Sequence, residues 1–299
     1  MKLGLSCMDI PRRYGFEKGL KLIKESGFDS VDISFTGLGN SDDDIYSASE
    51  DEFLTFFHDI KKKCDDLELE ISQTHGRLTT CVPDREESDR IKRNSALDLK
   101  ASAVLGAPVC IFHSIKSKDW EFICLEPEFM LKKSKEFFDD FLTPLCAKYQ
   151  VKFALETSGA TILTTGPEMN FIGDGRNLKT SFDMLESEYK TFCLDTGHSN
   201  EAHYYGGPTV QETIRILGKD ITALHLHDNQ GFYDSHLIPM ANCVGGVEWD
   251  KVFDALSEIG YKGVYNWELN LGYYGNYLSE ALPFLGKFLR YFTENEGRI

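Results

Sequence analysis

Imidazoles and carboxylates occur together most densely in residues 220–234, which read DITALHLHDNQGFYD. Residues 221–227 have the composition of a short buried strand, with His225 and His227 at its end. Asp234 and His236 follow in the next loop. Such groups are costly to bury unless something binds them, and a metal ion is the usual partner of such a set. The segment therefore predicts a metal site where this strand ends.

Other expected strands end in the same kinds of residue. The residues at these strand ends are His75, His113, Glu156, Asp195, His225 and Glu268. Three more lie in the segments that follow strands, namely His198, Asp234 and His236. In an α/β barrel the carboxyl ends of all strands meet at one face. So many ionisable groups at one face would repel each other or lack partners, so we expect cations among them.

Each of these residues also has an ordinary structural explanation when taken alone. A strand-end histidine can be a hydrogen-bonded core residue, and an acid there can cap a helix. Asp32 and His227 could belong to the site or have a structural role, and the sequence does not decide between these. His58 and His203 are expected outside the site. Carboxylates with imidazoles suit zinc, manganese, iron or cobalt better than calcium. The set contains no cysteine, which argues against a purely structural zinc site.

Composition narrows the class of protein. The 299 residues are 41% hydrophobic and 27% charged, as in soluble enzymes. No apolar run approaches the roughly 18 residues that span a bilayer, and the N-terminus lacks the apolar core of a signal peptide. Eight cysteines without a Cys-x-x-Cys pair predict reduced thiols and a cytoplasmic location. The net charge of −16 disfavours nucleic acid as a partner.

Short apolar runs alternate with longer amphipathic segments along the whole chain. The expected strands are 2–6, 30–34, 69–75, 108–113, 151–156, 191–195, 221–227 and 263–268. The expected helices are 16–25, 50–67, 85–105, 127–149, 208–217, 249–259 and 278–292, with at most a short helix near 181–186. Eight strands without an evident linker predict a single (β/α)8 TIM barrel domain over residues 1–299. A doubly wound open sheet is the alternative, but no Gly-x-Gly-x-x-Gly follows the first strand.

Several motifs then resemble a known superfamily. They are LETSG at 155–159, CLDTGH at 193–198, LHLHDN at 224–229 and GVEWDKVFDALSEIGYKGVYNWEL at 246–269. These segments resemble the xylose isomerase-like TIM barrels, which include sugar phosphate isomerases and epimerases, inosose dehydratases and endonuclease IV. The resemblance covers essentially the whole chain. It implies a barrel enzyme that depends on a divalent metal such as zinc or manganese.

The resemblance also implies roles for single residues. The central metal would be held by Glu156, Asp195, His225 and Glu268. The two glutamates would move protons, and His198 would help to bind and polarise the substrate. Endonuclease IV enzymes hold three zinc ions, and their further ligands would correspond to His75 and His113 for one ion and to His198, Asp234 and His236 for another.

Two departures count against the endonuclease. The chain has Asp-Thr-Gly-His where that group usually has Asp-Thr-Cys-His, and Glu156-Thr-Ser where it has an asparagine after the glutamate. Residues 35–52, FTGLGNSDDDIYSASEDE, form an acidic loop that would repel phosphates. The segment PMANCVGG at 239–246 is longer than the usual family turn, so a reshaped substrate lid is expected.

We therefore expect an isomerase or epimerase acting on a small carbohydrate, without a membrane or nucleic-acid partner. An endonuclease IV-like phosphodiesterase, a dehydratase or lyase, and a barrel without catalytic activity are the alternatives. Whether the substrate carries a phosphate stays open, because Arg12, Arg13, Arg77 and Lys116 form no recognisable phosphate cradle. The aromatic loop residues Trp120, Phe232, Tyr233 and Tyr273 could stack on a sugar or pack a lid. Family resemblance also implies a homo-oligomer.

Overall fold

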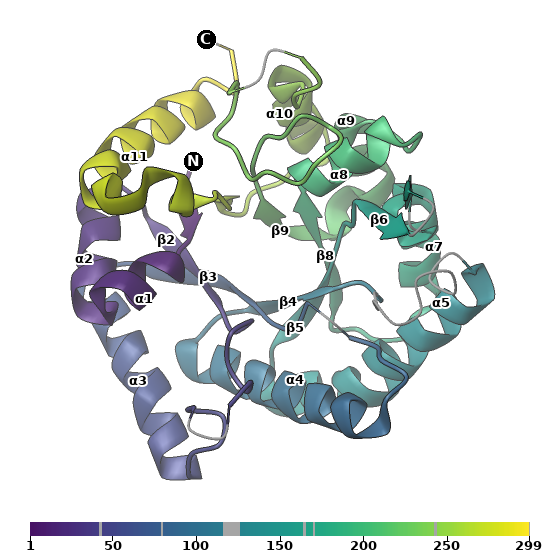
Figure 1. Cartoon of the computed structure of the whole chain (residues 1–299), viewed down its shortest axis with the longest axis horizontal. Helices are drawn as coiled ribbons and strands as arrows, with labels where there is room; N and C mark the ends of the chain where they lie inside the picture. The colour runs from purple at the N-terminus through teal and green to yellow at the C-terminus, as the bar shows by residue number, and fades with distance from the viewer. Residues whose placement is uncertain are drawn as a thin grey trace.

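Parallel strands form a barrel at the centre of the molecule, inside a ring of helices (Figure 1). The computed structural model describes residues 1–41, 44–78, 80–115, 126–163, 166–169, 171–241 and 244–298. The barrel strands are β1 (Leu3–Ser6), β2 (Ser30–Ser34), β3 (Glu70–His75), β4 (Val109–His113), β5 (Lys152–Glu156), β8 (Lys190–Asp195), β9 (Ile221–His225) and β10 (Tyr265–Trp267). Their order is β10-β1-β2-β3-β4-β5-β8-β9. A parallel bridge between Leu226 and Trp267 joins the two ends, so the predicted (β/α)8 barrel is confirmed.

Helices lie between successive strands and cover the outside of the barrel (Figure 1). They are α2 (Phe16–Glu25), α3 (Glu50–Asp66), α4 (Arg85–Leu105), α5 (Pro127–Ser134), α6 (Thr143–Tyr149), α7 (Gly175–Met184), α9 (Val210–Leu217), α10 (Trp249–Glu258) and α11 (Leu278–Glu294). A π-helical stretch, Lys135–Leu142, joins α5 to α6. None of the helices within the described ranges is long and apolar enough to cross a membrane.

The helix bounds follow from local sequence signals. Ser49 and Glu52 form a capping box at the start of α3, in which each side chain accepts from the other residue's backbone amide. Asp84 caps α4 by accepting from the amide of Glu87, and α4 ends at Gly106, whose φ of 73° lies in the left-handed region that glycine adopts at low cost. These signals are local, so the sequence could predict α4 with the observed bounds.

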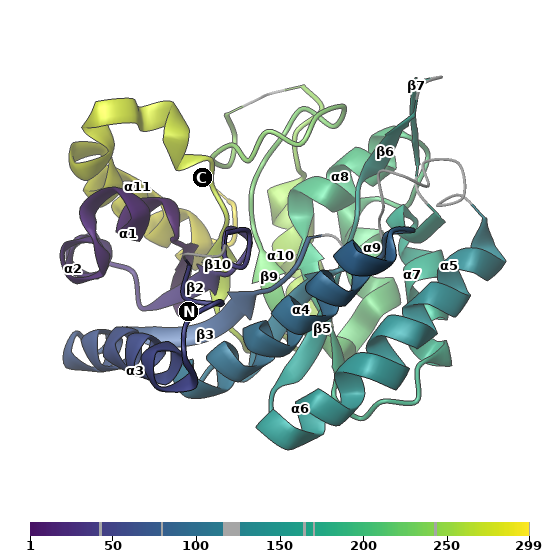
Figure 2. The ribbon, with the colours of Figure 1, turned by 60° about the horizontal axis from the view of Figure 1, so that its bottom comes forward.

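Four short elements were not expected. Two short strands, β6 (Ala160–Leu163) and β7 (Gly166–Met169), form an antiparallel hairpin after β5. This hairpin extends from the barrel at the end where the loop after β9 also lies (Figure 2). Two short helices, α1 (Asp9–Tyr14) and α8 (Thr196–Tyr204), follow β1 and β8. In addition α7 begins at Gly175, earlier than the short helix predicted near Ser181.

The barrel interior changes from apolar to ionisable along the strands. A small buried cluster inside the barrel consists of Val109, Ile111, Ala154, Cys193 and Ala223. The residue two positions after each of the last four is His113, Glu156, Asp195 or His225. Side chains two residues apart share a face of a strand, so these four also point inward, one layer closer to the carboxyl end. Strand alternation alone therefore positions the predicted ligands.

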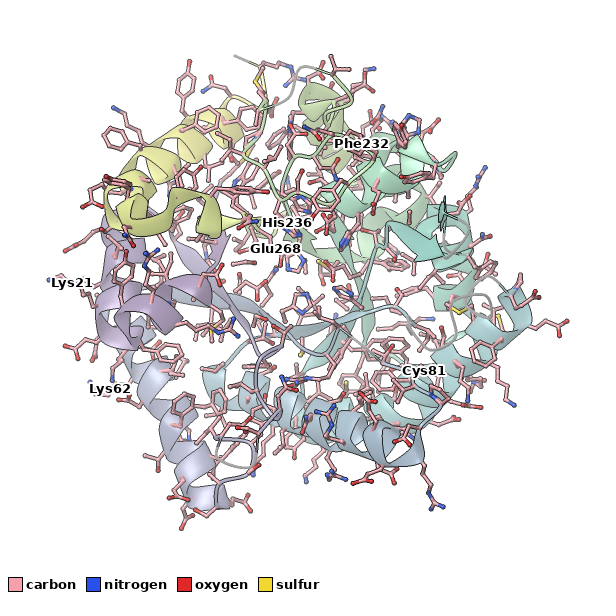
Figure 3. All side chains as sticks on the ribbon, in the orientation of Figure 1. Lys21, Lys62, Cys81, Phe232, His236 and Glu268 are labelled. Atoms are coloured by element: carbon pink, nitrogen blue, oxygen red, sulfur yellow. The ribbon has the colours of Figure 1, made fainter. Side chains whose placement is uncertain are left out.

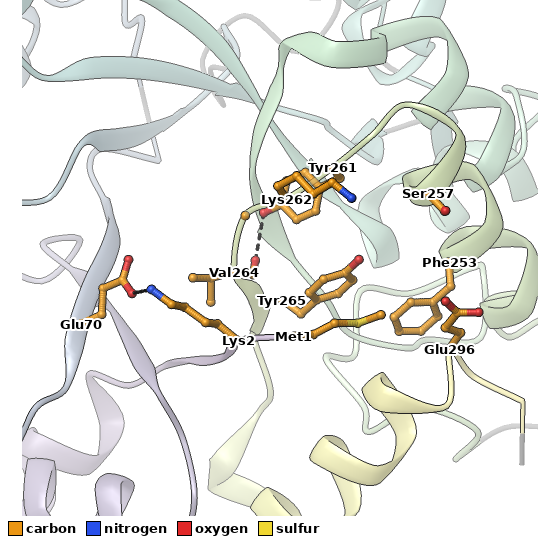
Figure 4. A pocket seen from close by; sticks show the side chains of 11 residues that line it. Met1, Lys2, Glu70, Phe253, Ser257, Tyr261, Lys262, Val264, Tyr265 and Glu296 are labelled. Carbon is orange, nitrogen blue, oxygen red and sulfur yellow. Dashed lines mark hydrogen bonds and ion pairs between the residues drawn. The ribbon is translucent and has the colours of Figure 1, made fainter.

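The opposite end of the barrel holds a shallow pocket of about 440 Å³ (Figure 4). Its wall includes the Lys2–Glu70 ion pair, both partners of which are largely exposed. The ring of Phe253 stacks on Tyr265, and the hydroxyl of Tyr261 donates to the carbonyl of Val264 at 2.9 Å. The strand-end acids and histidines are not part of this wall, so the candidate chemistry lies at the other end.

Candidate metal centre

Acids and histidines from seven of the barrel strands and the loops after them form one connected group, which we call the basin. Its members are Asp32, His75, His113, Glu156, Asp195, His198, His225, His227, Asp234, His236 and Glu268. Figure 3 shows His236 and Glu268 near the middle of the ring of helices, whereas Lys21 and Lys62 lie on the outside. Throughout the described ranges, the ion pairs of the basin carboxylates are all with histidines.

Glu156 occupies the centre of the basin and is only 1% exposed. Its Oε1 lies 2.7 Å from Nδ1 of His225. Its Oε2 lies 3.0 Å from Nε2 of His113 and 3.4 Å from Nε2 of His75, but accepts no hydrogen bond of good geometry from the described residues. A buried carboxylate oxygen without a hydrogen bond is costly in an apo protein and is what a cation would satisfy.

The ring of His225 is fixed from both sides. Its Nε2 lies 2.9 Å from Oδ2 of Asp32, and its Nδ1 also lies 3.2 Å from Oε2 of Glu268. If Nε2 carries the proton and donates it to Asp32, the lone pair of Nδ1 points to where Glu156 and Glu268 converge. A carboxylate behind a histidine is the usual arrangement around a protein-bound metal. Asp32, left open by the sequence, therefore lies behind a candidate ligand.

Asp195 completes the central group of four. Its Oδ1 accepts from the backbone amide of His198 at 2.6 Å, which caps α8. One ligand atom from each of Glu156, Asp195, His225 and Glu268 lies within 4.8 Å of the other three. Three of these side chains are buried and that of Glu268 is 23% exposed. Three carboxylates and one imidazole suit zinc or manganese, so the residues fit the predicted divalent metal.

Two further groups of possible ligands flank the central one. The first consists of His75, His113 and Glu156, and the second of His227, Asp234 and His236. In the second group the rings of His227 and His236 stack, with centroids 3.9 Å apart. His198 also reaches this group, because its Nε2 lies 3.3 Å from Oδ2 of Asp234 while its Nδ1 lies 3.0 Å from the carbonyl of Thr157. The sequence had left His227 unassigned.

Ionisation in the basin is shifted by these contacts. Burial opposes the charge of Glu156, yet the imidazoles of His113 and His225 hold its pKa well below the usual value. Burial also opposes the charge of His236, but Asp234 raises the pKa of this imidazole to about 9. Burial lowers the pKa of His113. The basin carboxylates thus favour positive charge among them, which a bound cation would supply.

Several residues that the sequence placed near this face have other roles. Arg77 is buried and pairs with Asp98, with 2.8 Å between Nε and Oδ2, and it donates to the carbonyls of Phe35 and Leu38. It therefore holds the loop after β2, and its guanidinium is not free to bind a phosphate. His58 is exposed on α3 and His203 is exposed on α8, both outside the basin as expected.

The aromatic candidates differ in what can be said of them. Phe232, Tyr233 and Tyr273 are all more than half exposed. Lys116 and Trp120 lie outside the described residues.

Sequence reasoning also missed the role of Asp228, a buried carboxylate directly after His227. The motif LHLHDN contains it, but only the contacts with the loop that follows it reveal what it binds.

Two curated proteins are similar to the chain in sequence over part of its length. Among curated proteins, the uncharacterized protein y4fM of Sinorhizobium fredii is 27% identical over 179 residues, 58% of this chain and 50% of that protein. The uncharacterized protein MJ1311 of Methanocaldococcus jannaschii is 35% identical over 81 residues, 27% of this chain and 26% of that protein. The matches thus span half or less of the length of these relatives.

Solved structures match over nearly the full length. The IOLI protein with a bound zinc atom has a TM-score of 0.74 at 17% identity, with 100% of each chain covered. A D-tagatose 3-epimerase-like protein has a TM-score of 0.69 at 19% identity, with 99% of each chain covered. D-psicose 3-epimerase in the presence of D-fructose has a TM-score of 0.67 at 14% identity, covering 97% of this chain and 99% of that one. At these identities the likeness shows a common fold.

A sequence model of the family described as xylose isomerase-like TIM barrel matches residues 20–284. This range begins within α2 and ends within α11, and it includes each basin residue. Because the match covers most of the chain, and the barrel agrees with it, the protein belongs to the xylose isomerase-like TIM barrel family.

Proposed function

We propose that the protein is a divalent-metal-dependent isomerase or epimerase of a small hydroxy-carbonyl sugar. The observation that carries the proposal is the central group, in which two of the four ligand side chains, Glu156 and Glu268, are also potential proton carriers. Both carboxylates reach the same nitrogen of His225, at 2.7 and 3.2 Å. A substrate in the basin would therefore meet both of them. The sugar epimerases among the structural neighbours support this choice of reaction.

A divalent cation bound by Glu156, Asp195, His225 and Glu268 would act as a Lewis acid on the carbonyl and hydroxyl oxygens of the sugar. One glutamate would remove the proton from the carbon next to the carbonyl, and the other would return it. Glu268, 23% exposed, is the glutamate that an entering substrate meets first. His198 would hold a substrate oxygen with Nε2, the nitrogen that lies 3.3 Å from Oδ2 of Asp234, since its Nδ1 is engaged by the carbonyl of Thr157.

The surroundings of the basin favour a sugar without a phosphate group. The basin carboxylates pair with histidines throughout the described ranges, and Arg77 is committed to Asp98. Among the described residues the basin contains no lysine or arginine, so a phosphate dianion would lack the cationic side chains that usually bind it. We therefore propose a free ketose or a related polyol derivative as the substrate.

The test is to follow a panel of ketoses and inososes by NMR in D2O with the metal-loaded protein. Wild type should incorporate deuterium at the carbon next to the carbonyl and form an isomer or epimer. Glu156→Gln and Glu268→Gln should each lower turnover by roughly 100-fold or more, because each removes a proton-transfer group. Both variants should keep the wild-type circular dichroism spectrum. Substantial turnover in either variant would contradict the assigned roles, and loss of water from an inosose would identify a dehydratase instead.

A second candidate function rests on the two flanking groups. His75 and His113 beside Glu156, and His227 and His236 beside Asp234, give the basin enough ligands for three cations. Several cations side by side are typical of phosphodiester hydrolysis, in which they stabilise the attacking and the leaving oxygen. Metal analysis of the purified protein separates the two candidates, because one bound ion favours the isomerase and three zinc ions favour an endonuclease IV-like phosphodiesterase. Cleavage of a duplex with an abasic site, with and without chelator, is the direct assay.

We also propose a cytoplasmic location and a homo-oligomer. Cys7, Cys64, Cys110, Cys146 and Cys193 are buried thiols, which fits a reducing compartment. Burial raises the pKa of Cys110 and of Cys193 well above the usual value, so these two thiols are protonated and inert at neutral pH. Sedimentation velocity would give the number of subunits.

A further inference from the structure

Asp228 is a buried carboxylate that four N–H groups surround. It follows β9 and is 1% exposed. Its Oδ1 accepts from the amides of Asn229 and Val247, both at 2.9 Å. Its Oδ2 accepts from the amide of Met240 at 2.9 Å and from the indole Nε1 of Trp249 at 3.0 Å. Each oxygen thus accepts two hydrogen bonds, as a carboxylate can.

These four N–H donors offset the free-energy cost of burying the charge of Asp228. Within the described ranges, no ion pair joins Asp228 to a lysine, arginine or histidine. A carboxylate is expensive to bury, and here N–H dipoles from one loop and from the first residue of α10 offset the cost. The loop in question, which we call loop 229–248, is described at residues 229–241 and 244–248, and it carries Asp234 and His236.

This loop contains strained backbone at a basin residue. His236 has φ of 48° and Met240 has φ of 63°, in the left-handed region that residues other than glycine seldom adopt. Such conformations persist only where surrounding contacts enforce them. The amide of Met240 is one of the donors to Asp228. The backbone of Asp228 also pairs with Leu237, the residue after His236, through two hydrogen bonds of 2.8 Å.

A neighbouring amide side chain ties the same loop to α8. Asn229 donates from Nδ2 to the carbonyl of Gly197 at 2.8 Å and accepts at Oδ1 from Asn200 Nδ2 at 2.8 Å. Asn200 Nδ2 also donates to the carbonyl of Gly245 at 2.8 Å. These bonds fix the loop relative to α8, the helix that carries the basin residue His198.

We propose that Asp228 is a positioning residue, whose carboxylate holds loop 229–248 in the conformation that directs Asp234 and His236 into the basin. It touches neither of these side chains and acts through the backbone of the loop. The inference rests on the proposed function only in treating Asp234 and His236 as groups of the functional site. Prior fixation of the loop means that its ligand atoms need no rearrangement when a cation or substrate arrives.

Asp228→Asn is the direct test, because an amide keeps the size of the side chain but replaces two acceptor positions by an NH2 group. Two N–H donors then lose their acceptor. Amide hydrogen exchange, measured on the full chain by mass spectrometry and NMR, should accelerate at Met240 or Val247 by about tenfold or more. Exchange in the barrel strands should stay as in wild type.

The matched control is Asp139→Asn. Asp139 also accepts from backbone amides, those of Glu186 and Ser187 at 3.0 to 3.3 Å, but it belongs to the π-helical stretch outside the basin. This variant should accelerate exchange near 186–187 and leave loop 229–248 unchanged. If Asp228→Asn fails to fold, Trp249→Phe keeps an aromatic ring at the site and removes one donor. It should then accelerate exchange at Met240 to a smaller extent.

Cobalt(II) binding gives a second readout that needs no substrate. In Asp228→Asn the Co²⁺ ion bound at the group of His227, Asp234 and His236 should show a changed absorption spectrum, and its dissociation constant should rise by roughly tenfold, as for outer-shell partners of metal ligands. Asp139→Asn should bind Co²⁺ like wild type. Wild-type exchange in the loop together with unchanged Co²⁺ binding would overturn the proposal. A wild-type protein without isomerase activity would refute the proposed function and leave the exchange and Co²⁺ results valid.

Discussion

At the scale of single residues, the contact between Asp32 and His225 has the clearest consequence. Asp32 also accepts from Ser6 Oγ and Gln73 Nε2, both at 3.1 Å. These two hydrogen bonds orient its carboxylate independently of His225. Burial opposes the charge of Asp32, yet His225 holds its pKa below the usual value. A negative charge behind the ring makes the other nitrogen of His225 a stronger ligand.

We therefore expect Asp32→Asn to weaken binding of Zn²⁺ or Mn²⁺ by about 10- to 100-fold, because the amide removes this charge. Competition titration with a chromophoric chelator measures the affinity. Ser6→Ala is the control, since it removes one hydrogen bond to Asp32 and leaves the pair with His225 intact. Equal affinities in Asp32→Asn and wild type would show that Asp32 serves the fold alone.

Residue types predicted most members of the basin, but not how they are arranged. The strand-end positions of Glu156 and His225 follow from alternation, because Ala154 and Ala223 lie one layer below them. In contrast, Asp32 and His227 could not be assigned, since their contacts come from residues far away in the sequence. Asp32 meets a histidine that is 193 positions later. Such pairs depend on closure of the barrel and leave no local signal.

At the scale of elements, α8 shows how tightly the site and the fold are joined. Its first turn contains Gly197, where a Cβ would lie 1.8 Å from Cε1 of His227. The helix can therefore approach β9 only because this residue lacks a side chain. The cap of the same helix is Asp195, a candidate ligand, so one side chain serves both the helix and the central group.

Gly197→Ala should lower the free energy of unfolding by about 1–3 kcal/mol, since the methyl group must displace a buried ring. Thermal or urea denaturation measures the change. In a background of His227→Ala the same substitution should cost much less, because the ring that it would displace is gone. Equal costs in both backgrounds would mean that the clash is relieved elsewhere, for example by a shift of α8.

The same element explains why part of the fold escaped prediction. Helices α2 and α4 have apolar residues at helical spacing or clear caps, and they appear with the predicted bounds. The sequence of α8, TGHSNEAHY, has no apolar stripe, because its buried face consists of small and polar residues such as Ser199 and Asn200. Hydrophobic periodicity cannot detect a helix that packs on polar groups.

At the scale of the whole molecule, both ends of the chain meet at Asp29. Its Oδ2 accepts from the amide of Leu3 and from Nη2 of Arg290 on α11, both at 2.8 Å. Burial opposes the charge of this carboxylate, but the bond from Arg290 holds its pKa below the usual value. An acid whose pKa is lower in the folded state stabilises the fold above its unfolded pKa, and this contribution is lost as pH falls through the folded pKa.

Asp29→Asn should therefore lower the free energy of unfolding at pH 7 by at most about 1 kcal/mol, because solvent screens this half-exposed pair. The difference from wild type should shrink as the pH falls below about 4, where the unfolded carboxyl group also takes up a proton. Urea denaturation between pH 3 and pH 7 measures it. A difference that does not vary with pH would mean that the charge of Asp29 contributes nothing.

Removal of divalent metal should destabilise the whole protein. A ligand present at 100 times its dissociation constant stabilises the folded state by about 2.7 kcal/mol, provided that the unfolded chain does not bind it. Calorimetry should therefore show a lower melting temperature after treatment with chelator and recovery on addition of Zn²⁺ or Mn²⁺. Glu268→Gln should respond less to the metal than wild type. Identical melting curves with and without metal would refute a tightly bound cation.

A cation at the candidate metal centre would also have a mechanical role, at the junction between β9 and β10. Strand β10 has three residues, and the barrel closes there through the bridge of Leu226 and Trp267, with hydrogen bonds of 2.8 and 3.0 Å. His225 precedes this bridge on one strand and Glu268 follows it on the other. A cation held by both side chains would cross-link the two strands at which the barrel closes. Loss of this cation would let β10, the shortest barrel strand, separate from β9. The C-terminal segment would then become accessible to proteases before the rest of the chain.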